Sequence, residues 1–352
     1  MAFCRHFGTC GGCTSQNLKR PEYLDAKRAL VLDALAREGL DASVVAEIVG
    51  VAPGTRRVAR FGARGGVVGF TERGSNTLFG VCECPVMRPE IVAALPALHA
   101  LAPKGFADMP VTLTDSGLDV VLRGADAPGR ARREEMAGLA AKAGFARISW
   151  QRAGQDRRHV AGLSEPIAAL RPVRMNFSGV AVDLPPAAFL QPTAEGEAVL
   201  VREAVAALKG AKRVADLYAG CGPFGLAVEG AVRAFEGDET MVAALDAAAR
   251  RAQKNIKAEA RDLARRPLLA RELDKFDGVV LDPPRPGAAP QAKELAKSKV
   301  PVIAYVSCNP LSFARDARML VDGGYKLQRV VPLDQFLWSE HVELVAKLTR
   351  SS

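Results

Sequence analysis

The chain has 352 residues, of which 49% are hydrophobic and 25% are charged, and it carries a formal net charge of +9 at pH 7. This length accommodates two domains with separate cores, and the composition is typical of a globular protein rather than a disordered one. No apolar run is long enough to span a bilayer, and the N-terminus lacks the basic-then-apolar order of a secretory signal. We therefore expect a cytoplasmic protein.

The basic balance, with an isoelectric point of about 9.3, favours a polyanionic partner such as nucleic acid. A charge that serves only solubility explains the composition equally well. The clustering of arginines favours RNA or DNA. These clusters are Arg56, Arg57, Arg60 and Arg64, then Arg130, Arg132 and Arg133, then Arg152, Arg157 and Arg158.

Residues 1–85 are interpreted as the first of three regions. Their hydrophobic spacing predicts a helix over 21–37, which Gly39 ends, and then short strands over 57–61 and 66–70.

Residues 86–185 are interpreted as a central α+β region. Their pattern predicts a helix over 89–101, a hairpin over 111–122 that turns at Asp115 to Gly117, a helix over 130–143 and a strand over 146–150.

Residues 186–352 alternate between strand and helix signals, which is typical of βαβ units in an α/β fold with a parallel sheet. The predicted strands are 214–217, 232–236, 278–281, 302–306 and 342–348, and the predicted helices are 197–208, 240–258, 291–298 and 312–322.

Three cysteines lie close together near the N-terminus. Cys4, Cys10 and Cys13 fall within ten residues, and Gly11 and Gly12 let the chain turn tightly between the last two. A fourth thiol is available from Cys82 or Cys84. Four thiolates suit zinc or an iron–sulfur cluster, and the spacing does not separate the two. An odd total of seven cysteines without a secretory signal argues against a disulfide framework.

A glycine-rich turn, which starts at Gly220, follows the strand over 214–217. Glu236 ends the next strand, where a carboxylate accepts hydrogen bonds from a ribose diol, and Asp262 follows the helix after it and suits an adenine amine. Each acid alone reads as an ordinary loop carboxylate. Their order after successive strands instead indicates a nucleotide-type cofactor.

Two further strands end in chemically suggestive residues. Asp282 leads into three prolines that make a rigid strand exit, which favours a substrate platform. Cys308 ends an apolar strand and lies between Ser307 and Asn309, which favours a reactive thiol over an inert buried one. Glu343 is a candidate general base in the last strand, where it shares a face with His341.

Taken together, these motifs resemble the RNA (uracil-5-)-methyltransferase family over nearly the whole chain. The resemblance rests on the three N-terminal cysteines, Cys84 to Met87, Phe189 to Gln191, Asp216 to Phe224, Asp282 to Arg285, Ser307 to Pro310 and His341 to Glu343. It implies a Rossmann-like class I methyltransferase domain that uses S-adenosylmethionine, preceded by an α+β iron–sulfur and RNA-recognition region.

The resemblance also implies residue roles. Cys4, Cys10, Cys13 and Cys84 hold a [4Fe–4S] cluster. The methyl donor, or the base beside it, is bound by Gln191, Tyr218, Gly220, Glu236 and Asp282, and Asp262 contacts the adenine. Cys308 is the nucleophile that adds to uracil C6, and Glu343 removes the C5 proton. Pro223 stands where the family often has Asn, so one donor contact is expected to be missing.

These implications lead us to expect a monomeric enzyme that makes 5-methyluridine in 23S rRNA. A transfer RNA methyltransferase with the same chemistry is the nearest alternative. A non-catalytic RNA-binding protein on a methyltransferase scaffold and a zinc-dependent DNA-binding protein are the alternatives from other classes.

Overall fold

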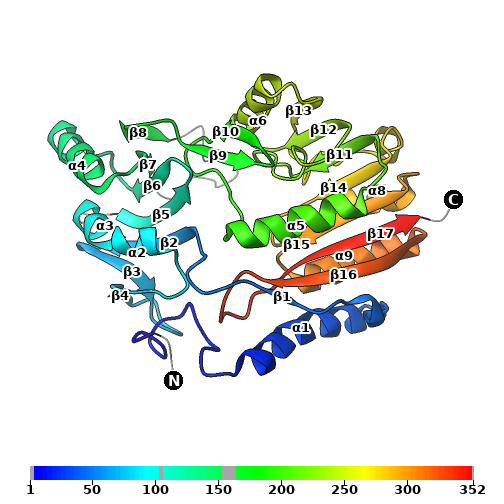
Figure 1. Ribbon diagram of the computed structural model, residues 1–352, viewed down its shortest axis with the longest axis horizontal. Helices are drawn as coiled ribbons and strands as arrows, with labels where there is room; N and C mark the ends of the chain where they lie inside the picture. The colour runs from blue at the N-terminus through cyan, green and yellow to red at the C-terminus, as the bar shows by residue number, and fades with distance from the viewer. Residues whose placement is uncertain (1–3, 103–105, 153–163, 351–352) are drawn as a thin grey trace.

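A computed structural model describes residues 4–102, 106–152 and 164–350, which form two large sheets and one two-stranded ribbon. Figure 1 shows the sheets side by side: one holds β1 and the strands of the C-terminal half, and the other holds strands β2 to β8. Within these ranges no helix combines the length and apolarity that a membrane span requires. Arg157 and Arg158, from the predicted arginine clusters, lie outside the described residues.

The larger sheet has eight strands in the order β1-β16-β17-β15-β14-β11-β12-β13. Its strands are β1 (Val49–Gly50), β11 (Arg213–Leu217), β12 (Ala231–Glu236), β13 (Ile256–Ala260), β14 (Gly278–Leu281), β15 (Val302–Ser307), β16 (Tyr325–Asp334) and β17 (Glu343–Arg350). The strands from β11 to β15 run parallel, as the alternation predicted, whereas β17 runs antiparallel to both β15 and β16. The order reverses between β11 and β14, where parallel α/β sheets bind their ligands.

Helices cover both faces of this sheet. One buried cluster joins α5 (Ala194–Ala207) and α6 (Glu239–Arg251) to one face. A second joins the opposite face to α1 (Arg20–Arg37), α7 (Ala270–Leu273), α8 (Ala289–Lys297) and α9 (Pro310–Asp322). The strands therefore bury apolar side chains on both sides, which explains their nearly continuous hydrophobic runs.

The smaller sheet has seven strands in the order β4-β3-β2-β5-β6-β7-β8. They are β2 (Val58–Arg64), β3 (Val67–Thr71), β4 (Leu78–Gly80), β5 (Phe106–Thr114), β6 (Gly117–Gly124), β7 (Arg147–Arg152) and β8 (Glu165–Ala169), and they pack on α2 (Pro89–Ala93), α3 (Leu95–Leu101) and α4 (Arg130–Ala143). A short turn, η1 (Ala42–Val44), precedes β1, and the ribbon of β9 (Arg174–Phe177) and β10 (Val180–Asp183) precedes α5.

The sheets divide the chain differently from the predicted regions. The smaller sheet continues across residue 85, because β2 pairs with β5 from Val58 with Thr112 to Gly62 with Asp108. The N-terminal segment joins the larger sheet, because β1 pairs with β16 and α1 packs in the same core as α9. The three-region division stays a prediction, but its first boundary does not separate two sheets.

Most predicted elements are confirmed, including the hairpin, in which Thr114 pairs with Gly117. The helix predicted over 240–258 is wrong at its end. It stops at Arg251, Gln253 takes a φ of 53°, and Ile256 begins strand β13. The helix predicted over 89–101 is two helices, because Pro96 starts a new one after a break at Ala94.

The loop that joins β16 to β17 is fixed to α1 by a buried polar network. Nζ of Lys27 donates to Oδ1 of Asp334 at 2.7 Å, to the carbonyl of Phe336 at 3.0 Å and to the carbonyl of His341. The Tyr23 hydroxyl donates to Oδ2 of Asp334 at 2.6 Å and accepts from the Trp338 amide at 2.7 Å. The side chain of Lys27 is 3% exposed and that of Asp334 is 0% exposed.

Substituting Lys27→Met tests this anchor. The change leaves the Asp334 carboxylate buried without its cation, so we expect the free energy of unfolding to fall by about 3–5 kcal/mol. Chemical denaturation followed by circular dichroism measures it. The matched control is Lys326→Met on the exposed side of β16.

The double variant Lys27→Met, Asp334→Asn removes both charges and is expected to recover part of the lost stability. A Lys27→Met protein as stable as the Lys326→Met control would contradict the anchoring role of the ion pair.

Candidate active site

Three predicted site residues meet at the carboxyl edge of the larger sheet. Asp282 follows β14, Cys308 follows β15 and Glu343 starts β17. Leu281 pairs with Tyr305 and Ser307 pairs with Leu344, so the strand register brings Cys308 level with Glu343. An antiparallel strand delivers its first residue to the edge where parallel strands deliver their last.

A chain of hydrogen bonds connects the two carboxyl groups through two glutamine amides. Nε2 of Gln191 donates to Oδ2 of Asp282 at 2.9 Å, and Nε2 of Gln335 donates to Oε1 of Gln191 at 2.8 Å and to Oε2 of Glu343 at 3.0 Å. Sequence reasoning named Gln191 but missed Gln335. The available signal was its position directly after Asp334, in the same polar run that carries Glu343.

Burial perturbs all three titrating groups at this edge. Burial, and then the charge of Asp282, raises the pKa of Glu343 well above its usual value. Burial raises the pKa of Asp282 to about 7. Burial, followed by the charges of Glu343 and Asp282, raises the pKa of Cys308 to about 11, and Arg285 acts in the opposite direction. The thiol and the carboxyls therefore influence one another's protonation, as groups at catalytic sites often do.

The glycine-rich turn after β11 has an unusual backbone. Tyr218, Gly220 and Gly222 all have positive φ, at 62°, 54° and 89°. A bulky residue such as Tyr218 is strained there, and such strain concentrates at ligand sites. Oε2 of Glu236 accepts a hydrogen bond from the Gly220 amide at 2.8 Å, so the residue predicted to bind the ribose also stabilises the turn.

Asp216, within strand β11, supports the same turn from below. Its Oδ2 accepts from the Gly225 amide at 2.9 Å, and its Oδ1 has no hydrogen-bond partner among the described residues. Burial raises the pKa of Asp216 to about 8.

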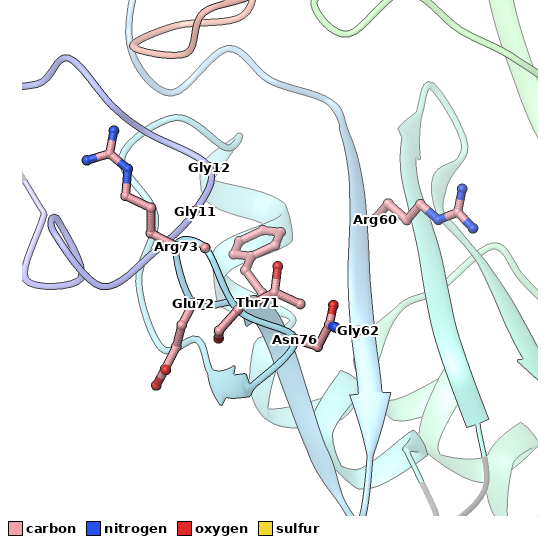
Figure 2. A pocket seen from close by; sticks show the side chains of 11 residues that line it. Gly11, Gly12, Arg60, Gly62, Thr71, Glu72, Arg73 and Asn76 are labelled. Atoms are coloured by element: carbon pink, nitrogen blue, oxygen red, sulfur yellow. The ribbon is translucent and has the colours of Figure 1, made fainter.

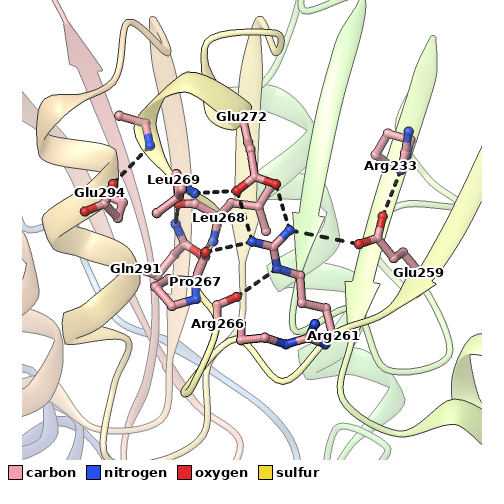
Figure 3. A network of polar contacts seen from close by, with 11 residues as sticks. Arg233, Glu259, Arg261, Arg266, Pro267, Leu268, Leu269, Glu272, Gln291 and Glu294 are labelled. Carbon is pink, nitrogen blue, oxygen red and sulfur yellow. Dashed lines mark hydrogen bonds and ion pairs between the residues drawn. The ribbon is translucent and has the colours of Figure 1, made fainter.

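Asp262 lies after β13, directly after Arg261 in the sequence. Figure 3 shows how the side chain of Arg261 fixes this loop. Arg261 pairs with both carboxylate oxygens of Glu272, at 2.8 and 3.0 Å, and donates to the carbonyls of Arg266 and Pro267. Oδ1 of Asp262 accepts from the amides of Ala264 and Arg265. The residues predicted to bind the methyl donor therefore lie at the ends of β11, β12, β13 and β14, along one edge of the sheet.

A cleft of about 220 Å³ opens at Cys308. One wall comes from α1 and includes Leu30 and Ala34, and the opposite side includes Arg285 and His341. The N-terminal helix thus helps to form the entrance to the candidate nucleophile.

The four predicted metal-binding cysteines lie around one small pocket of about 20 Å³. Cys4, Cys10, Cys13 and Cys84 line it, whereas Cys82 is exposed, with its Sγ 3.5 Å from Nε2 of His6. Across the described ranges no group of three or more such side chains is arranged to hold a single metal ion. Burial raises the pKa of Cys13 to about 11.

The cysteine pocket borders the loop between β16 and β17. Cys13 and Cys84 pack against a small core that contains Leu337 and Trp338. The Thr14 amide donates to the Trp338 carbonyl at 2.7 Å.

A separate groove of about 590 Å³ lies on the smaller sheet, as Figure 2 shows. Gly11 and Gly12 lie beside the turn after β3, and both segments line the groove. Arg60 borders it from β2 but is paired with Asp108. None of the predicted site residues lines this groove, so the carboxyl edge is the candidate active site.

Comparison with known proteins decides the family. The sequence model described as tRNA (Uracil-5-)-methyltransferase matches residues 180–351. An uncharacterised RNA methyltransferase of Mesorhizobium japonicum is 44% identical over 99% of this chain and 84% of its own length. The 23S rRNA (uracil(1939)-C(5))-methyltransferase of Chromohalobacter salexigens is 33% identical over 99% of this chain and 76% of its own. The chain belongs to the RNA (uracil-5-)-methyltransferase family.

A solved structure confirms the predicted fold. The tRNA (uracil-54, C5)-methyltransferase of Pyrococcus abyssi, in complex with S-adenosyl-L-homocysteine, matches with a TM-score of 0.74 at 24% identity, over 96% of this chain and 86% of its own. As a member of this family, the chain is an enzyme that methylates RNA and takes the methyl group from S-adenosylmethionine, as the motifs predicted. Membership of this family favours an RNA methyltransferase over the alternative of a zinc-dependent DNA-binding protein.

Substituting Glu272→Gln tests the loop of Asp262. The change breaks the paired hydrogen bonds to Arg261, so we expect the free energy of unfolding at pH 7 to fall by about 1 kcal/mol. Thermal denaturation measures it, with Glu134→Gln in the exposed Arg130 pair as the control.

The effect of Glu272→Gln also depends on pH. The Arg261 hydrogen bonds lower the pKa of Glu272 to about 2. Because the folded pKa lies below the unfolded value of about 4.3, the stabilisation is complete above that value and is lost as the pH falls toward 2. The two proteins should therefore converge in stability in acid, and a difference that stays constant down to pH 2 would contradict the assignment.

Proposed function

We propose that this methyltransferase acts on C5 of a uridine in 23S rRNA, with Cys308 as the nucleophile and Glu343 as the base. The observation that carries the residue assignment is the strand register, which sets Cys308 level with Glu343 at the ligand-binding edge. The relative from Chromohalobacter salexigens, named as a 23S rRNA enzyme, supports the choice of RNA.

The proposed reaction balances as follows. Sγ of Cys308 adds to uracil C6, which makes C5 an enolate carbon, and C5 then takes the methyl group as S-adenosylhomocysteine leaves. Glu343 removes the C5 proton, the electrons of that bond rebuild the C5–C6 double bond, and the C6–Sγ bond breaks. The uridine must leave its stack to reach the edge, as in other enzymes that modify bases.

The bound donor supplies an electrophilic methyl group and a positive charge, which favours the thiolate form of Cys308. We assign donor binding to the sheet-edge residues. Backbone amides of the turn at Gly220 accommodate the donor beside Tyr218, Glu236 suits the ribose hydroxyls, and Asp262 suits the adenine amine. Asp282 and Gln191 lie between the donor side and Glu343.

We also infer that Cys4, Cys10, Cys13 and Cys84 hold a [4Fe–4S] cluster. Four thiols around one pocket suit this ligation, and a cluster spaces its thiolates more widely than a single ion does. Arg56 lies near Cys13 and Cys84 and would offset their negative charge. Methyl transfer needs no electron, so the proposed cluster has a structural role.

Cys308→Ala tests the nucleophile. RNA containing 5-fluorouridine should trap the wild-type enzyme, because fluorine cannot leave as a proton does and the C6–Sγ bond persists. We expect a denaturation-resistant adduct with the wild type, none with Cys308→Ala, and donor affinity within about 3-fold of the wild type, because the thiol acts on the base. Gel electrophoresis and calorimetry measure these quantities.

Cys82→Ala is the control, because that thiol is exposed and lines neither the cleft at Cys308 nor the cysteine pocket. Retained turnover in Cys308→Ala would overturn the assignment. Adducts with transfer RNA but not with 23S rRNA would favour the alternative substrate, which the name of the Pyrococcus abyssi enzyme makes the second candidate.

Cys84→Ser and Cys82→Ser form a matched pair for the cluster. Only Cys84 lines the pocket with the other three cysteines, so we expect Cys84→Ser to lose iron and sulfide and Cys82→Ser to keep both. Metal and sulfide analysis of anaerobically purified protein measures this. Zinc without sulfide, or equal loading of the two variants, would contradict the proposal.

A further inference from the structure

We propose that Gln335 is a positioning residue for the base: its side-chain N–H fixes Glu343 and ties it to Gln191 on the donor side. The inference rests on the proposed function, because it takes Glu343 as the base. Gln335 is 0% exposed, directly follows β16, and donates both to Oε1 of Gln191 and to Oε2 of Glu343.

Gln335 leaves Glu343 in one orientation. Glu343 is 2% exposed. Among the described residues, Gln335 is the one hydrogen-bond donor to its carboxyl group. The bond engages Oε2, so Oε1 stays available to receive a proton. Burial disfavours the ionised form of a carboxyl group unless a hydrogen-bond donor stabilises it. A base must be ionised to accept a proton, so Glu343 needs such a donor.

The surroundings of Gln335 are shaped for this side chain. A Cβ atom at Gly196, in the first turn of α5, would collide with Oε1 of Gln335 and with Oγ1 of Thr193. Oε1 of Gln335 has no hydrogen-bond partner among the described residues, although an unpaired buried carbonyl is destabilising. The Gln335 side chain therefore uses its N–H groups for the bonds to Gln191 and Glu343 and leaves its own carbonyl unpaired.

The backbone of Gln335 is held independently of those bonds. The preceding residue, Asp334, is the carboxylate that Lys27 and Tyr23 bind. The Phe336 carbonyl on the other side also accepts from Lys27. Gln335 thus stands on an anchored segment, so its amide presents a fixed donor, as a group that orients a catalytic side chain must.

Removal of the donor has a defined effect on protonation. The ionisable groups that face Glu343 are Asp282 from β14 and Cys308 from β15. Arg285 lines the same cleft as Cys308. Lys27 is paired with Asp334, directly before Gln335, and Glu197 of α5 is paired with Arg57. The Gln335 bond is the contact that lowers the pKa of Glu343 against burial and Asp282. Without it, the base ionises at higher pH.

The test compares Gln335→Met with Gln328→Met, the same substitution at an exposed site in β16. We expect Gln335→Met to turn over unmodified substrate RNA about 100-fold more slowly, because a displaced base slows proton removal. The acidic limb of its pH–rate profile should move to higher pH. Donor affinity, measured by calorimetry, should stay within about 3-fold of the wild type, because Asp282 still holds Gln191.

The decisive readout is the covalent intermediate. Addition and methyl transfer precede proton removal, so Gln335→Met should accumulate a methylated Cys308–RNA adduct on unmodified RNA, which denaturing gels and mass spectrometry detect. Adduct formation on 5-fluorouridine RNA should stay close to the wild-type rate. Gln335→Leu also removes the amide and introduces no ionisable group, so it should accumulate the adduct as well, and it serves if Gln335→Met does not fold.

A variant at Gln335 that folds and loses turnover without accumulating the adduct would overturn the proposal, because a merely structural defect slows addition as well. Turnover and a pH profile equal to those of Gln328→Met would also overturn it. Failure of the proposed function is distinguishable, since the wild-type enzyme would then form no adduct with 5-fluorouridine RNA.

Discussion

The buried ion pair between Lys27 and Asp334 is the contact on which the geometry of the site depends. It fastens a helix near the start of the chain to the loop just before its last strand. One ammonium group holds Asp334 at the start of that loop and the carbonyls of Phe336 and His341 within it. Helix α1 therefore fixes the loop that carries Gln335 and leads to Glu343, although it is far from both residues in the sequence.

The site itself balances two opposing needs. The proposed nucleophile, Cys308, and the proposed base, Glu343, lie at one edge of the sheet, where burial disfavours the charged form of each and the charge of Glu343 further disfavours the thiolate. Two amides, from Gln191 and Gln335, separate the carboxyls of Asp282 and Glu343 and give each a donor. The positive charge of a bound methyl donor would add to that of Arg285 in offsetting the negative charges at this edge.

Sequence reasoning succeeded where a local pattern determines the structure. The apolar runs before Asp282 and Cys308 form strands that are buried except at the half-buried Val302, and a parallel sheet brings their ends together. It failed where the outcome depends on distant partners. Strand β16 mixes polar and apolar residues and includes Pro332, and it forms because β17 and β1 pair with it. Gln335 escaped notice because its role is set by Gln191, 144 residues earlier.

The anchor also imposes an order on biosynthesis. Lys27 can meet Asp334 only after 307 further residues have been made. The smaller sheet, whose pairings lie within residues 58–169, can form while the rest is still being made. The Cys13 thiol, in contrast, packs against a core that is incomplete until Leu337 and Trp338 have been made. During synthesis this thiol therefore remains open to oxidants and to stray metal ions over more than 300 residues of chain growth.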